Sequence, residues 1–266
     1  MRIVLGVEYD GSAFCGWQSQ PQACAVQDAL DRALAEIAGE RIVSVCAGRT
    51  DAGVHALAQV VHFDTLAERP LSAWIRGTNA LLPETVAVNW ARQVAPEFHA
   101  RFSATGRRYV YCLLNRPQRA GLMHSRVGWF HQTLDVDAMR RAVRCLIGEH
   151  DFSAFRAAEC QAKTPVKVMR ELQITRRGEI IRFEFAADAF LQHMVRNIVG
   201  SLVYIGCGRQ PVEWLEELLQ ARDRTRAAPT FSPAGLYLSA VEYDPIWALP
   251  PLPRVEPIED AMLAGN

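Results

Sequence analysis

The sequence predicts an α+β fold with two similar subdomains. Three observations support this prediction. Strand and helix patterns alternate over the first hundred residues, a similar series restarts at residue 107, and residues 170–188 alternate in hydrophobicity like an antiparallel hairpin with one buried face. A chain of 266 residues is long enough for one large domain or for two smaller ones. We expect subdomains at 1–105 and 106–244, followed by a Pro-rich tail at 245–266.

The first subdomain is expected to have the order β-α-β-α-β. Residues 2–9 alternate as a strand does. The helix expected at 26–38 has an apolar stripe along one face, and Gly39 is suited to end it. The remaining elements are strand-like runs near 42–47 and 57–64, a helix near 71–81 and a strand near 85–94.

The second subdomain is expected to begin with a strand in RRYVYCLL (107–114). A helix is predicted in DVDAMRRAVRCLIGEH (135–150), where Asp135 or Asp137 can cap the first turn. Arg177 and Gly178 lie near the turn of the hairpin. The last elements expected are an apolar helix at 190–205, a helix at 211–221 and a strand in GLYLSAVEYD (235–244).

The overall charge gives no support for a polyanionic partner, because 29 basic and 29 acidic residues leave a net charge of zero. Lys163 and Lys167 are the only lysines, so nearly all the cations are arginines. Genome composition explains such an excess equally well. The runs RRYVYCLLNRPQR, RRAVR and ARDRTR are nevertheless compatible with a basic face, since arginine suits both phosphates and bases.

Neither a signal peptide nor a membrane span is expected. Glu8 and Asp10 interrupt the apolar start of the chain, and its most apolar run contains Gln, His, Arg and Asn. The seven cysteines are odd in number, scattered and without a CxxC pair. We expect free, mostly buried thiols of a cytoplasmic protein, and no metal site, because His55 and His62 do not combine with them at a metal-ligand spacing.

The segment GRTDAGVHA (48–56) is the first candidate for chemistry. Gly48 and Gly53 allow a sharp turn and the close approach of a ligand. Arg49 and Asp51 are two residues apart, so in extended backbone they share one side. A neighbouring guanidinium lowers the pKa of a carboxyl, which suits a nucleophile or an electrostatic stabiliser. A turn in which Asp51 only binds nearby backbone amides fits the same residues.

Three more side chains need a partner or a function. Arg196 lies in the apolar run 190–205, where an unpaired buried cation is costly, although it can also extend into solvent. Tyr109 and Tyr111 face the same side of one strand. Their spacing alone does not distinguish packing from ligand binding.

GRTDAGVHALAQVVHFDT closely resembles the signature of the TruA-type tRNA pseudouridine synthases. Other segments resemble further blocks of this family in the same order and together span about residues 3–243. These segments are EYDGSAFCGWQSQP, NALLP, FHARFSATGRRYVY, GEHDFSAF, FLQHMVRNIVG and APTFSPAGLYLSAVEY. Two features depart from the family: Ala25 stands where a Ser or Thr cap is common, and the tail after Asp244 matches nothing.

The resemblance implies the pseudouridine synthase fold, in which two subdomains, each a mainly antiparallel sheet covered by helices, flank a cleft. It implies a cofactor-free isomerase that converts uridine to pseudouridine in the anticodon stem-loop of tRNA and acts as a homodimer. Asp51 corresponds to the essential aspartate of the family, and Tyr109 to the ring that lies against the target uracil. Arg196 corresponds to the arginine that pairs with the aspartate, Arg49 to one that holds the flipped nucleotide, and Leu236 to an apolar residue of the pocket.

Two other functions fit parts of the sequence. An RNA-binding protein of this fold without activity would have little use for the set formed by Asp51, Tyr109 and Arg196. A hydrolase of small molecules with an aspartate nucleophile would not need the arginine-rich runs.

Overall fold

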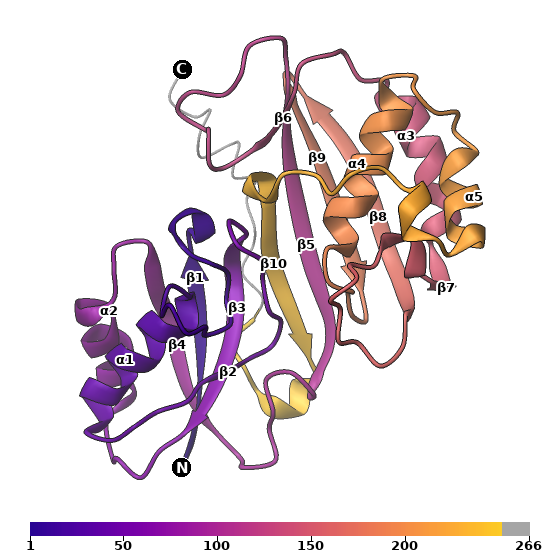
Figure 1. Ribbon diagram of the computed structural model, residues 1–266. Helices are drawn as coiled ribbons and strands as arrows, with labels where there is room; N and C mark the ends of the chain where they lie inside the picture. The colour runs from indigo at the N-terminus through magenta and orange to yellow at the C-terminus, as the bar shows by residue number, and fades with distance from the viewer. Residues whose placement is uncertain (252–266) are drawn as a thin grey trace. The chain divides into compact units, whose positions relative to one another are not determined.

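The computed structural model describes residues 1–251, and these form two compact units (Figure 1). One unit contains Met1–Thr105 and residues 237–251, and the other contains Gly106–Leu236. Each unit combines helices with a mainly antiparallel sheet, so the predicted α+β class is confirmed.

The first unit has a sheet in the order β4-β1-β3-β10, with β2 paired to β3. Neighbouring strands are antiparallel, except that β10 runs parallel to β3 with Tyr237 opposite His55. The helices α1 and α2 lie together beside β4 (Figure 1). The elements are β1 (Arg2–Tyr9), α1 (Val26–Ala38), β2 (Val45–Cys46), β3 (His55–Asp64), a π-helical turn (Ala73–Gly77), α2 (Thr78–Leu81), β4 (Val86–Val94) and β10 (Leu236–Tyr243).

The second unit has a sheet in the order β5-β9-β8-β7, with β6 parallel to β5. Three helices, α3, α4 and α5, pack together beside this sheet (Figure 1). The elements are β5 (Ala104–Asn115), β6 (Gly128–Phe130), α3 (Val136–Ala142), β7 (Gly148–Asp151), β8 (Val166–Arg177), β9 (Ile180–Ala187), α4 (Met194–Gly206) and α5 (Trp214–Ala221).

Two predicted helices are wrong at their ends. The helix expected at 135–150 ends at Ala142, and after one 3-10 turn the chain enters β7 at Gly148, whose φ is +108°. The helix expected at 190–205 begins at Met194, because His193 has a φ of +63°. The backbone just before it binds another segment, since Ala157 N donates to Gln192 O at 3.0 Å. Such contacts join residues that are far apart in the sequence, so a local hydrophobic pattern does not predict them.

The expectation that all cysteines are free thiols is wrong for one pair. Cys15 and Cys24 form a disulfide, with their Cα atoms 5.5 Å apart. The intervening residues fold back on themselves, and Cys15 N donates to Cys24 O at 3.0 Å. The other cysteines of the described chain, Cys46, Cys112, Cys145, Cys160 and Cys207, are free.

The last predicted strand lies at 236–243, and its residues from Tyr237 onward belong to the first unit rather than to the second half of the chain. Residues 245–247 of the predicted tail form a 3-10 turn, and its part from 252 onward lies outside the described residues. None of the helices within residues 1–251 has the length and apolarity needed to span a bilayer.

Candidate active site

Asp51 lies in the loop between β2 and β3. Val54 N donates to Asp51 O at 3.1 Å, which closes a turn over residues 51–54. Gly53, in the third position of this turn, has a φ of +76°, a conformation that glycine adopts without strain. Asp51 is half-buried and Arg49 is exposed, so the loop presents a carboxylate and a guanidinium two residues apart.

The side chain of Gln59 fixes the start of this loop. Gln59 lies in β3 and is fully buried. Its Nε2 donates to Gly48 O at 2.7 Å, and its Oε1 accepts from Gly48 N at 3.4 Å. One amide therefore binds both backbone polar groups of Gly48, which a buried apolar side chain would leave unsatisfied.

The opening segment of the chain supports the residues next to Asp51. Trp17 N donates to Thr50 O at 3.0 Å, and the Tyr9 hydroxyl lies 2.8 Å from Thr50 Oγ1. Gly16 has a φ of +101°, and a Cβ atom there would lie 2.8 Å from Thr50 O. Only glycine therefore fits beneath the loop without displacing it.

Cys46 ends β2 just before the loop. Burial raises the pKa of its thiol to about 12, while the charges of Arg49 and Arg101 act in the opposite direction. The thiol is therefore protonated at neutral pH and is not a nucleophile beside Asp51.

The predicted residues of the second unit lie in well-packed surroundings. Tyr109 is in β5 and is 9% exposed, and its ring meets that of Phe190 edge to face with centroids 5.0 Å apart. Leu236 is 5% exposed and begins β10 after a 3-10 turn at Pro233–Gly235.

Arg196 is half-buried in the first turn of α4. Its Nε donates to Phe231 O at 2.9 Å, and Phe231 N donates to Arg196 O at 3.3 Å. The next residue, Asn197, is fully buried and accepts from Thr230 Oγ1 at 2.7 Å. The segment around 230–231 therefore holds both the side chain and the backbone of Arg196.

The structure brings Arg49 and Asp51 together in one loop of the first unit and places Tyr109, Arg196 and Leu236 in the second. The pairing of Arg196 with Asp51 stays a prediction. Within residues 1–251, His, Cys, Asp and Glu side chains do not gather in groups of three or more that could bind a metal ion.

The family model described as tRNA pseudouridine synthase matches residues 6–103 and 142–244. These ranges contain Asp51 with its supporting residues, and Arg196. The chain belongs to the tRNA pseudouridine synthase family. The family predicted from the sequence is therefore confirmed.

Curated members of this family are similar over almost their whole length. The tRNA pseudouridine synthase A of Dechloromonas aromatica is 60% identical over 94% of this chain and 95% of its own. The tRNA pseudouridine synthase A of Thiobacillus denitrificans is 61% identical over 94% of this chain and 96% of its own. A solved Cbf5-Nop10-Gar1 complex contains a chain with 11% identity and a TM-score of 0.39, covering 89% of this chain and 48% of that one. With so low an identity and TM-score, this structural similarity gives no information about the site.

Sequence reasoning missed the residues that hold the loop in place. Gln59 interrupts the apolar run LAQVVHF, and a polar residue inside a buried strand is a signal of a required hydrogen bond. Gly16 precedes Trp17 in the opening motif, but nothing local shows that this segment packs beneath Asp51. In this member of the family, the signature and the opening motif form one structural unit.

Proposed function

We propose that this member of the tRNA pseudouridine synthase family isomerises uridine to pseudouridine in the anticodon stem-loop of tRNA, with Asp51 as its catalytic group. We further propose that it acts in the cytoplasm as a homodimer. The reaction class follows from the family. The observation that supports the role of Asp51 is its loop, which is held at Gly48 by Gln59 and at Thr50 by Tyr9 and Trp17. A carboxylate on a fixed backbone is suited to act on one position of a bound nucleotide.

The target uridine must first leave its stack, at a cost of a few kcal/mol. In the proposed mechanism the base stacks on the ring of Tyr109, which returns about 1–3 kcal/mol. Arg49 holds the flipped nucleotide, and Leu236 provides apolar contact to it. Arg196 pairs with the carboxylate of Asp51.

Asp51 then assists cleavage of the bond between uracil N1 and the ribose. Two routes agree with an anionic carboxylate: attack on the anomeric carbon, or removal of a proton from the neighbouring sugar carbon to give a glycal. The released uracil rotates and rejoins the sugar through C5. The C5 proton is lost, N1 regains a proton, and the sum is an isomerisation with no change in oxidation state.

The release of tritium from tRNA labelled at uridine C5 tests this proposal. We expect Asp51→Asn to abolish release while binding tRNA with an affinity close to that of the unmodified enzyme. Glu36→Gln is the control, because Glu36 is an exposed carboxylate of the same unit, in α1 and outside the loop. Undiminished release from Asp51→Asn would contradict the catalytic role. Binding without release by the unmodified enzyme would instead indicate an inactive RNA-binding protein.

A further inference from the structure

Phe102 is exposed at the end of a turn in the first unit. Its side chain is 77% exposed, and its ring stacks on that of His99 with centroids 4.3 Å apart and planes 30° apart. The guanidinium of Arg101 lies 5.9 Å from the centre of the same ring. We call these three side chains the Phe102 surface.

The turn fixes the orientation of this surface. His99 N donates to Ser103 Oγ at 3.0 Å, and Ser103 N donates to His99 O at 2.8 Å. The Nδ1 atom of His99 accepts from Arg101 N at 3.2 Å and from Phe102 N at 3.3 Å. His99 therefore uses Nδ1 as an acceptor, and its ring cannot rotate without losing both bonds. Burial lowers the pKa of His99, which favours the neutral ring that this geometry requires.

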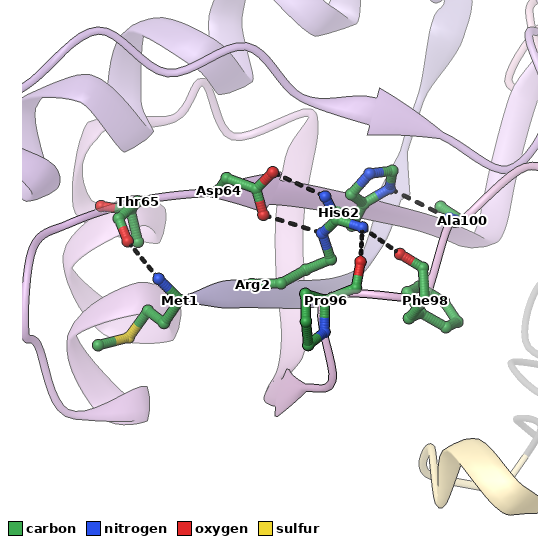
Figure 2. Close-up of polar contacts among 8 residues, drawn as sticks. All are labelled: Met1, Arg2, His62, Asp64, Thr65, Pro96, Phe98 and Ala100. Atoms are coloured by element: carbon green, nitrogen blue, oxygen red, sulfur yellow. Dashed lines mark hydrogen bonds and ion pairs between the residues drawn. The ribbon is translucent and has the colours of Figure 1, made fainter.

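Residues of β1 and β3 bind the segment 96–100 that leads into the turn, as Figure 2 shows. Arg2 donates to both carboxylate oxygens of Asp64, at 2.8 and 2.7 Å, and its Nη1 donates to Phe98 O at 2.7 Å and to Pro96 O. Ala100 N donates to His62 Nδ1 at 3.1 Å. The protein thus holds an exposed phenyl ring on a rigid support.

An exposed apolar side chain is by itself ordinary. Phe102 differs because its ring is already ordered, so a flat ligand can stack on it with little loss of side-chain entropy. Nucleobases are flat ligands of this kind, and the guanidinium of Arg101 beside the ring suits a phosphate. Ala100, next to this surface, binds His62 of β3, and Cys46 pairs with the adjacent Val61. Because β2 ends at Cys46 and leads into the Asp51 loop, the turn of Phe102 packs against the two strands that carry this loop.

We propose that the Phe102 surface binds a nucleotide of the substrate RNA close to the target uridine, with a base stacked on Phe102 and its phosphate beside Arg101. This proposal rests on the proposed function and extends it by a second RNA contact within the first unit. Phe102 is a binding residue here and takes no part in the chemical step.

The test compares Phe102→Leu, Phe102→Ala and Phe102→Trp in the full chain, with tRNA dissociation constants and steady-state kinetics. Leucine keeps the apolar character but has no ring, so the dissociation constant and KM should rise about 5- to 100-fold in the Leu and Ala variants. In the Trp variant the dissociation constant and KM should stay close to those of the unmodified enzyme. The kcat at saturating tRNA should stay unchanged in all three variants. Leu66→Ala is the matched control, because Leu66 is an apolar residue of the same unit that is 86% exposed.

Two results would overturn the proposal. One is a Leu variant that binds tRNA as tightly as the unmodified enzyme. The other is a change of oligomeric state in the Leu or Ala variant, measured by light scattering, because the surface would then bind a second copy of the chain. A failure of the proposed function looks different: the unmodified enzyme would release no tritium, while its tRNA binding would still depend on the ring at position 102.

Discussion

Gly16 lies directly against the backbone of the loop that carries Asp51. At φ +101° any other residue is strained, and a Cβ atom would also lie 2.8 Å from Thr50 O and 3.1 Å from Ala52 N. We expect Gly16→Ala to lower the free energy of unfolding by about 1–3 kcal/mol and kcat at least tenfold. Tritium release at saturating tRNA and urea unfolding measure the two effects.

Gly39→Ala is the control for this prediction. Gly39 has a φ of +72°, but a methyl group there would meet no atom of the described chain within 4 Å. This variant has the backbone strain without the contact, so its stability should fall while kcat stays unchanged. Equal losses of kcat in the two variants would show that strain alone, and not support of the Asp51 loop, explains the effect.

At the scale of elements, the sequence predicts β1 and α1 to the residue. Both depend on short-range signals: a short, nearly continuous apolar run in one, and in the other an apolar stripe closed by Gly39 in the left-handed conformation. The start of α4 was missed because the backbone of Gln192 binds Ala157 and Cys160, which lie far away in the sequence. For the same reason the sequence located Asp51 but not Gln59 or Gly16, which act on it from other elements.

His62 connects β3 to the turn that carries Phe102, and its titration should weaken this connection. Burial lowers the pKa of His62 to about 4, below its usual value near 6.5. Between these two values the unfolded chain binds a proton that the folded chain does not. The free energy of unfolding should therefore fall by up to about 3 kcal/mol as the pH decreases from 6.5 to 4.

Urea unfolding between pH 4.5 and 7.5 tests the role of His62. In His62→Gln the fall in stability below pH 6.5 should be much smaller, because glutamine does not titrate. His131→Gln, at an exposed position, should keep the pH dependence of the unmodified protein. If His62→Gln keeps it too, other groups are responsible for the loss of stability.

The disulfide between Cys15 and Cys24 closes the segment that contains Gly16 and Trp17. The two cysteines are nine residues apart, and closing a loop of this size stabilises a fold by about 2–3 kcal/mol. Reduction by dithiothreitol should lower the free energy of unfolding by this amount. The double variant Cys15→Ser, Cys24→Ser should be equally destabilised and insensitive to the reductant, whereas Cys145→Ser should respond as the unmodified protein does.

At the scale of the whole molecule, the pairing of β10 with β3 joins residues that are far apart in the chain. Tyr237 lies opposite His55, and their rings stack with centroids 4.6 Å apart. Local hydrophobic patterns identify such a strand but not its partner. The sequence therefore predicts β10 as an element but not the strand with which it pairs.

The net charge of the molecule is zero, so binding of a polyanion must depend on how its charges are arranged. Each phosphate that an arginine neutralises releases counterions, which makes the affinity decrease with salt. We expect the logarithm of the tRNA dissociation constant to rise linearly with the logarithm of the salt concentration. Arg49→Gln should lower this slope by about one, whereas Arg41→Gln, at an exposed position outside the Asp51 loop, should leave it unchanged. A slope near zero in the unmodified enzyme would mean that shape and stacking, rather than phosphate contacts, provide the affinity.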